Sequence, residues 1–319
     1  MYQNHFKCKL VPFPRVLPSP CLRVRYVFLS CPSVTYSSSP CPRVPASPRP
    51  ECFTMIKLGI FDSGIGGLTV YKEVRQALPG ADIHYFGDTA RVPYGTKSAE
   101  TVTQYSIQIG TYLQASGVDA VVIACNTASA YAIDVLRSVL PIPVFGVVLP
   151  GAAAAVRSTS NGIIGVIGTR GTVASGAYQR AITELDPDMK VVAAHCPLFV
   201  PLVEEGWLLD PITQEVAIRY LESLMEEGVD TLVLGCTHYP MLKEVISMVM
   251  GHEVTLIDSA EETAVKLKEY LDDNGFVDET ASGTDLFEVT DLPQRFQDVG
   301  QVFLDRKLEN VQQVTIVEE

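Results

Sequence analysis

Two cysteines stand in the same local setting in this chain, and the repetition suggests paired chemistry. Cys125 follows the apolar run "VVIA" and precedes Asn126 and Thr127, whereas Cys236 follows "LVLG" and precedes Thr237 and His238. A single cysteine after an apolar strand most often fills space in a core. Two cysteines in matching strand-to-helix turns favour function, because active groups of α/β folds gather in such turns.

Two equivalent thiols that face each other across a small ligand suit proton transfer at one carbon atom. One thiolate removes a proton while the opposite thiol supplies its replacement, which inverts a stereocentre. Each cysteine also lies at a helix start, so we expect its surroundings to lower the thiol pKa from about 8.5. A cysteine hydrolase instead needs one nucleophile with a dedicated histidine base. Cys196, in "AHCPLF", has no matching partner and is interpreted as a packing residue.

Several polar residues near these turns are further candidates, each with a structural alternative. The stretch "FDSGIGG" (61–67) lacks the GxGxxG and GxxxxGK[ST] patterns, so its glycines are interpreted as bringing backbone N–H groups to a carboxylate. Asp62 is either a helix cap or an acid–base neighbour, and Tyr94 is either a packing aromatic or a donor to substrate. His238 is a proton partner of Cys236 or a structural histidine, and Glu204 in "PLFVPLVEEG" can equally be a solvated helix-end charge.

The pattern of apolar runs from Met55 onward predicts alternating strands and helices, and therefore an α/β fold built on parallel sheets. The expected strands are 56–61, 82–86, 119–124, 142–147, 162–168, 190–194, 230–235 and 254–258. The expected helices are 66–78, 97–116, 127–140, 172–183, 210–227, 240–250 and 259–273. Because "GIFDSG" matches "GVIGTR" and the cysteine strands repeat, we expect two pseudo-symmetric lobes, 55–149 with 259–319 and 150–258, with the active site in the cleft between them.

Composition separates the first 54 residues from the rest of the chain. They contain ten of the 21 prolines, five of the eight cysteines and one acidic residue, and they are interpreted as a proline-rich disordered extension outside the functional unit. A secretory signal fits this stretch badly, and an organelle transit peptide fits it somewhat better. Residues 55–319 carry 17 Lys/Arg and 36 Asp/Glu, a net charge of −19 that argues against nucleic acid or an anionic membrane as partner.

The three cysteines of the body also limit the chemistry. Their odd number and wide spacing argue against a disulfide framework and against zinc, and they favour a reducing compartment. The sequence has no uninterrupted apolar run of about 18 residues, so we expect no transmembrane helix.

Six motifs together resemble one known family. "GIFDSGIGGLTV", "DTARVPYG", "ACNTAS", "IGVIGTRGTV", "CPLFVPLVEEG" and "GCTHYPML" occur in the order seen in the glutamate racemases of the cofactor-independent aspartate/glutamate racemase superfamily. The resemblance spans about residues 56–305, and residues 1–54 have no counterpart in it.

The resemblance implies an enzyme that interconverts L- and D-glutamate for peptidoglycan synthesis, without pyridoxal phosphate or metal. It implies that Cys125 is the base acting on D-glutamate and Cys236 the base acting on L-glutamate, with Asp62, Glu204 and His238 assisting the thiols. The substrate-binding residues that it implies are Asp62, Ser63, Tyr94, Gly95, Asn126, Thr127, Thr237 and His238. We further expect a cytoplasmic homodimer.

Three other functions remain open at this point. An aspartate racemase would differ in the length of its side-chain pocket. A two-lobed protein could bind a dicarboxylate without turnover. A redox switch would form a reversible disulfide between Cys125 and Cys236.

Overall fold

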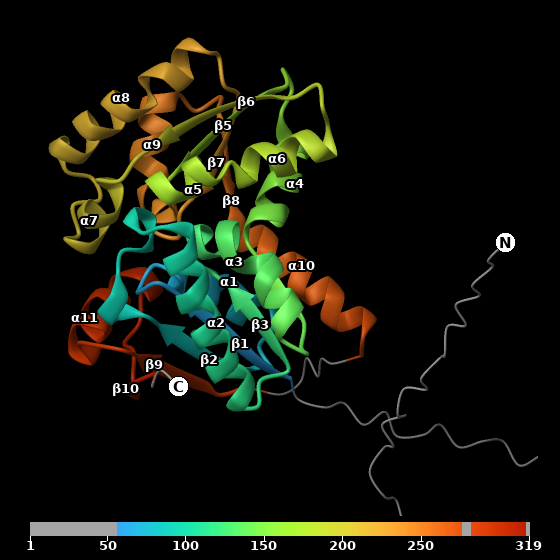
Figure 1. The fold of residues 1–319 in the computed structure, drawn as a ribbon. Coiled ribbons are helices and arrows are strands. Elements are labelled where there is room, and N and C mark those ends of the chain that lie inside the picture. The colour runs from blue at the N-terminus through green and yellow to red at the C-terminus, as the bar shows by residue number, and fades with distance from the viewer. Residues whose placement is uncertain (1–55, 276–281, 317–319) are drawn as a thin grey trace, which may run out of the picture. The chain divides into compact units, whose positions relative to one another are not determined.

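The computed structural model describes residues 56–275 and 282–316 and contains two separate parallel sheets (Figure 1). The predicted extension, residues 1–54, lies outside the described residues. The first sheet has the strand order β10 (Val311–Gln313), β9 (Asp285–Val289), β2 (Asp82–Gly87), β1 (Lys57–Asp62), β3 (Ala120–Ile123) and β4 (Val144–Gly146). The second has the order β6 (Lys190–His195), β5 (Ile163–Gly168), β7 (Thr231–Gly235) and β8 (Thr255–Asp258).

Helices cover these sheets and connect their strands. They are α1 (Leu68–Ala77), α2 (Ala99–Ala115), α3 (Asn126–Val139), α4 (Val148–Ser158), α5 (Arg170–Ser175), α6 (Ala177–Leu185), α7 (Phe199–Glu204), α8 (Pro211–Glu226), α9 (Lys243–Met250), α10 (Ser259–Asp273) and α11 (Pro293–Leu304). Every strand pairing among the described residues is parallel, as expected of strand–helix alternation. The predicted α/β class is confirmed.

Two helices carry the chain between the sheets. Helix α4 follows β4 of the first sheet and leads to β5 of the second, and α10 follows β8 and returns the chain to β9 of the first sheet. The two helices contact each other, and Figure 1 shows them on one side of the molecule. The exact lobe boundaries that the sequence suggests stay a prediction.

The apolar runs located all eight expected strands, but several helices and the C-terminal strands differ from expectation. The helix expected at 172–183 is two helices, α5 and α6, because Gly176 adopts a left-handed conformation (φ 64°) between them. The lobe boundary expected between residues 149 and 150 falls inside α4, which an alanine run stabilises. Helices α7 and α11 and strands β9 and β10 were not expected.

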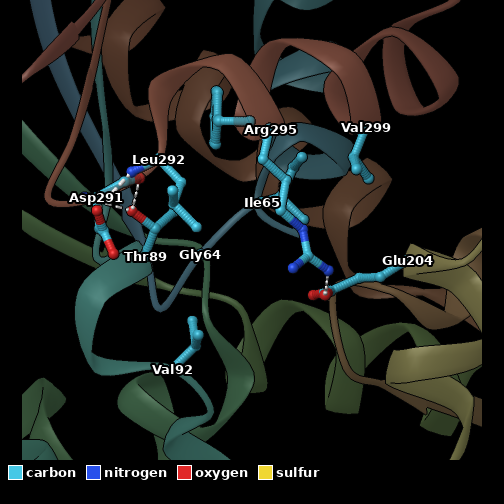
Figure 2. Close-up of a pocket in the computed structure, with 10 residues that line it drawn as sticks. Gly64, Ile65, Thr89, Val92, Glu204, Asp291, Leu292, Arg295 and Val299 are labelled. Carbon is cyan, nitrogen blue, oxygen red and sulfur yellow. Dashed lines mark hydrogen bonds and ion pairs between the residues drawn. The ribbon is translucent and has the colours of Figure 1, made fainter.

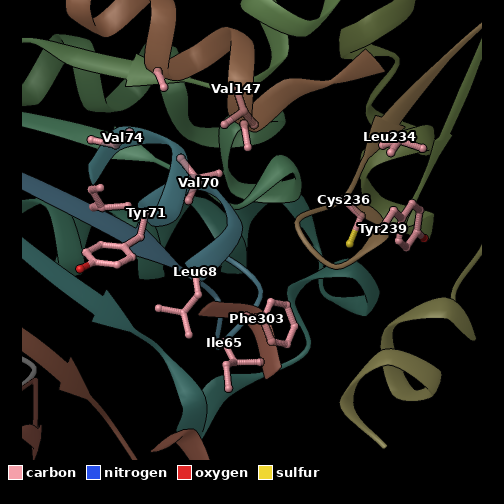
Figure 3. Packing of buried hydrophobic residues seen from close by; sticks show 14 of the residues in the cluster. Ile65, Leu68, Val70, Tyr71, Val74, Val147, Leu234, Cys236, Tyr239 and Phe303 are labelled. Atoms are coloured by element: carbon pink, nitrogen blue, oxygen red, sulfur yellow. The ribbon is translucent and has the colours of Figure 1, made fainter. Parts of the chain in front are cut away.

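The two cysteines of interest lie at the edges of different hydrophobic clusters. Cys125 belongs to the cluster that packs α2 and α3 on the first sheet, together with Phe61 and Ile123. Cys236 belongs to a larger cluster that includes Leu234 and Tyr239, shown with neighbouring residues in Figure 3. Each thiol therefore lies just beyond the carboxyl end of a strand and packs against one of these clusters. Within the described ranges, no helix is long and apolar enough to cross a membrane.

Candidate active site

A small cavity lies where the carboxyl ends of strands from both sheets meet. Its volume is about 50 Å³, and residues after β1, β3, β5 and β7 line it together with the loop after β2 and helix α7. The lining includes all but one of the residues predicted from the sequence, namely Ser63, Tyr94, Gly95, Cys125, Asn126, Thr127, Glu204, Cys236, Thr237 and His238. The fold thus brings both cysteines to one cavity.

Cys125 ends the apolar run of β3 and is the N-cap residue of α3. Its side chain is buried, and its Sγ lies 3.7 Å from Oγ of Ser63. Its carbonyl accepts a hydrogen bond of 2.8 Å from the backbone N–H of Ser129, within the first turn of α3. The predicted helix start is confirmed, with Asn126 and Thr127 in the first turn of α3.

Cys236 follows β7, and its thiol is the first member of a row of polar contacts that continues through His238 to Glu204. Its Sγ lies 4.0 Å from Nδ1 of His238, and Nε2 of His238 lies 3.1 Å from Oε1 of Glu204. The hydrogen bond from His238 is the main cause that lowers the pKa of Glu204 below its ordinary value. The arrangement links the thiol through an imidazole to a carboxylate, which is the geometry of a base oriented by a third group.

The expectation that the surroundings lower the thiol pKa is wrong for this structure. Burial raises the pKa of Cys125 to about 12, with a further rise from the carboxylate of Asp62, and burial also raises the pKa of Cys236. Backbone N–H groups, such as that of Ala128 near Cys125, act in the opposite direction but do not compensate for the lost hydration. Burial therefore favours the neutral thiol over the thiolate at both cysteines.

Asp62 is the one predicted site residue that does not line the cavity. It is fully buried at the end of β1, and its Oδ2 accepts a hydrogen bond of 3.0 Å from the backbone N–H of Gly64. Its Oδ1 has no partner among the described residues. Burial raises its pKa, although the charge of His238 acts against this rise. Asp62 is thus a buried carboxyl group close enough to influence both Cys125 and His238.

Sequence reasoning missed two threonines that connect the sheets at the cavity. Oγ1 of Thr127 lies 2.8 Å from Oγ1 of Thr169 and 3.1 Å from Oγ1 of Thr172. Thr169 lines the cavity and is the N-cap residue of α5. Both residues lie in "IGVIGTRGTV", one of the six motifs of the resemblance, of which "GVIGTR" was also matched to "GIFDSG", but neither threonine was given a role. Their hydroxyl groups form a cluster that joins the two sheets beside the thiols.

The glycines of the "FDSGIGG" stretch permit close contact between the two halves of the site. A Cβ atom on Gly66 would lie 2.3 Å from Oγ1 of Thr237 and 2.4 Å from Nδ1 of His238. A Cβ atom on Gly95 would lie 2.5 Å from Cβ of Thr169. Real Cβ contacts are not that short, so any side chain at Gly66 would displace His238 from its place beside Cys236.

A larger cavity of about 200 Å³ adjoins the first one and shares Gly64, Val92 and Glu204 with it (Figure 2). Arg295 of α11 reaches into it, and its Nη2 lies 3.8 Å from Oε2 of Glu204. Helix α11 therefore contacts the Glu204 carboxylate through Oε2, whereas His238 contacts the other oxygen, Oε1.

Two parallel sheets whose strand ends bring a pair of buried thiols to one cavity define the class of protein, which is a racemase. A family model described as Asp/Glu/Hydantoin racemase matches residues 59–267. A glutamate racemase of Geobacter metallireducens is 53% identical over 260 residues, which cover 81% of this chain and 96% of that protein. The chain belongs to this racemase family and, within it, to the glutamate racemases.

Solved structures agree with this assignment. The glutamate racemase RacE1 of Bacillus anthracis has a TM-score of 0.79 at 38% identity, with 82% of this chain and 98% of that chain covered. A glutamate racemase of Francisella tularensis, solved in complex with D-glutamate, has a TM-score of 0.77 at 38% identity and the same coverage. An aspartate racemase of Picrophilus torridus, at 16% identity and a TM-score of 0.50, shares the fold alone.

Proposed function

We propose that this protein interconverts L- and D-glutamate by proton transfer between two thiols at the α-carbon. The observation that supports this most is that Cys125 and Cys236 follow strands of different sheets and line the same buried cavity. Two thiols carried by different sheets can approach one bound carbon atom from two sides, which a single base cannot do without moving.

The proton balance of the reaction is simple. With L-glutamate bound, Cys236 as thiolate takes the α-proton, and Cys125 as thiol donates its proton to the opposite face. The Cα–H bond breaks on one face and forms on the other, leaving Cys236 as thiol and Cys125 as thiolate. D-glutamate reacts by the reverse path, so the two cysteines exchange roles.

The thiolate has to be generated inside the site because burial keeps both thiols neutral. His238 is the proposed acceptor for the proton of Cys236, since its Nδ1 is the nearest basic atom at 4.0 Å among the recorded contacts of this thiol. Glu204, at 3.1 Å, stabilises the imidazolium that results. Asp62 is proposed to assist on the side of Cys125.

Substrate recognition is proposed to rest on neutral donors rather than on lysine or arginine. The residues that line the catalytic cavity include neither, although they include the hydroxyls of Ser63, Thr127 and Thr237 and the amide of Asn126. Such donors, together with the backbone N–H groups at the start of α3, can hold a carboxylate and stabilise charge that develops during proton removal. Tyr94 and Gly95 form the adjoining wall.

The proposed substrate is glutamate because the relatives between 46% and 53% identity are glutamate racemases and a structural neighbour holds D-glutamate. We also propose that the product supplies D-glutamate for peptidoglycan in the cytoplasm and that the enzyme is a homodimer. Rescue of a D-glutamate auxotroph tests the supply of D-glutamate for peptidoglycan. Fluorescence imaging of the tagged chain tests the cytoplasmic location, and light scattering tests the homodimer.

The decisive experiment follows racemisation of each glutamate enantiomer by circular dichroism for the wild type, Cys125→Ser and Cys236→Ser. Each substitution is expected to lower kcat/KM by at least about a thousandfold, since general acid–base groups contribute 10²–10⁴-fold and a serine hydroxyl is a much weaker acid than a thiol. Cys196→Ala is the control, because Cys196 is buried but does not line the cavity. Racemisation by either serine variant near the wild-type rate would overturn the proposal, as would turnover of aspartate in place of glutamate.

A further inference from the structure

A buried tyrosine from the second sheet's helices holds a residue of the catalytic cavity. The hydroxyl of Tyr178, on α6, donates a hydrogen bond of 2.7 Å to Oδ1 of Asn126, the first residue of α3. Tyr178 is 1% exposed and Asn126 is 2% exposed. The contact therefore crosses from one half of the molecule to the other without solvent between its partners.

This hydrogen bond decides which end of the amide is free. Because Oδ1 of Asn126 accepts from Tyr178, the NH₂ group at the other end is the part left available. Nδ2 is buried and has no hydrogen-bond partner in the described part of the chain, although Asn126 lines the catalytic cavity. A buried amide N–H without a partner is costly, so its persistence points to an acceptor that a ligand supplies.

Tyr178 is itself held firmly. A Cβ atom on Gly235 would lie 3.1 Å from Cε2 of the ring, and one on Gly151 would lie 3.3 Å from the hydroxyl oxygen, so two glycines make room for this side chain. Burial raises the pKa of Tyr178, while a hydrogen bond from the side chain of Ser259 acts in the opposite direction. The phenol therefore stays protonated and remains a donor.

We propose that Tyr178 is a positioning residue for glutamate turnover, which orients the amide of Asn126 so that its NH₂ group faces a carboxylate of the substrate. The inference rests on the proposed racemase function. Without the hydroxyl, the amide can rotate by half a turn and present its oxygen to the anionic substrate. L- and D-glutamate have equal free energies, so any loss of kcat/KM has to be the same in both directions.

The test compares Tyr178→Phe with Tyr71→Phe, which removes another buried tyrosine hydroxyl. Tyr71 lies on α1 outside the cavity and donates a hydrogen bond of 2.6 Å to Asp285. Tyr178→Phe is expected to weaken D-glutamate binding, measured by calorimetry, and to lower kcat/KM about tenfold, the worth of one hydrogen bond of this kind. Tyr71→Phe is expected to lower the melting temperature without changing D-glutamate affinity or kcat/KM.

A double-mutant cycle on D-glutamate affinity separates positioning from a general structural effect. If Tyr178 acts through the amide, Tyr178→Phe has no further effect on affinity in an Asn126→Ala background. Full additivity of the two substitutions, or unchanged affinity and kcat/KM in Tyr178→Phe alone, would overturn the inference. Failure of the wild type to racemise glutamate would instead refute the proposed function.

Discussion

Nε2 of His238 lies 3.1 Å from Oε1 of Glu204, and the opposite ring nitrogen faces Cys236. Glu204 comes from α7 and His238 from the turn after β7, so two segments of the second half combine to support one thiol. Arg295 of α11 contacts the same carboxylate from the other side at 3.8 Å. The pair is thus the point where α11, α7 and the turn after β7 meet.

Replacement of Glu204 by glutamine should slow racemisation without unfolding the protein. The amide keeps the shape of the side chain but no longer stabilises a positive imidazole. We expect kcat/KM to fall roughly tenfold in both directions, less than the 10²–10⁴-fold that a direct acid or base contributes. Glu205→Gln is the matched control, since the Glu205 side chain is 67% exposed and its ion pair among the described residues is a 4.0 Å contact with Arg295. Equal rates for Glu204→Gln and the wild type would contradict the role of this carboxylate.

The two thiols of the cavity should react slowly with alkylating agents. Burial raises the pKa of Cys125 to about 12 and raises that of Cys236 as well, whereas an ordinary thiol has a pKa of about 8.5. Only the thiolate is alkylated, so at pH 8 both residues should react with iodoacetamide at least a hundredfold more slowly than free cysteine. Mass spectrometry of the two tryptic peptides measures this rate. Rapid, complete labelling at pH 7 would show that the resting enzyme holds a thiolate.

Substitution of Gly66 by alanine should remove activity with a moderate loss of stability. The new Cβ atom would overlap Thr237 and His238, which have to move away from Cys236. We expect a loss of more than a hundredfold in kcat/KM and about 1–3 kcal/mol in the free energy of unfolding, the usual range for overpacking. Gly59→Ala is the control, because its Cβ would meet only carbon atoms of the Leu113 and Val118 side chains, at 3.1 Å or more. Full activity in Gly66→Ala would mean that the close approach is not needed.

A buried cluster away from the site should make stability depend on pH. Glu288 of β9 accepts hydrogen bonds from Tyr112, at 2.8 Å, and from His84, at 2.7 Å if Nε2 carries the proton. Burial alone would raise the pKa of Glu288, but these two partners outweigh it and the pKa is lowered. A carboxyl group whose pKa is lower in the folded state stabilises the fold fully above its unfolded value of about 4.3, and this contribution disappears as pH falls through the folded pKa.

We therefore expect Glu288→Gln to lower the free energy of unfolding by about 1–2 kcal/mol at pH 7. The difference from the wild type should shrink as the pH falls from about 5 to 3, where the native carboxylate also gains a proton. Urea titrations at several pH values measure this. Glu227→Gln, which removes a half-exposed partner of Lys190, should cost little at any pH. A pH-independent difference for Glu288→Gln would show that its charge is not involved.

The sequence allowed the strands and the paired cysteines to be predicted because both are local patterns. Apolar runs such as "VVIA" and "LVLG" mark strands covered on both faces, and each is followed directly by its cysteine. The short strands β9 and β10 could not be predicted in this way, since only the pairing of β9 with β2, and of β10 with β9, gives them a place in the sheet. Helix α4 could have been predicted from its alanine run, which was interpreted instead as a boundary.

Other features depend on contacts between distant residues. The thiol pKa was mispredicted because the helix start is visible in the sequence, whereas the desolvation that outweighs it depends on packing around Cys125. The hydrogen bond from Tyr178 to Asn126 joins residues that are 52 positions apart in the sequence and belong to different halves of the molecule. Neither residue type predicts this contact. Such contacts can be recognised only once the two sheets are placed.

The most direct test of two-thiol catalysis is racemisation of L-glutamate in heavy water, stopped at low conversion. Two separate acid–base groups predict that the D-glutamate formed carries solvent deuterium at Cα while the remaining L-glutamate keeps its original hydrogen, with the mirror result from D-glutamate. D-glutamate that retains the substrate's own hydrogen would show that one group moves the proton between faces. That result would contradict the roles assigned to Cys125 and Cys236.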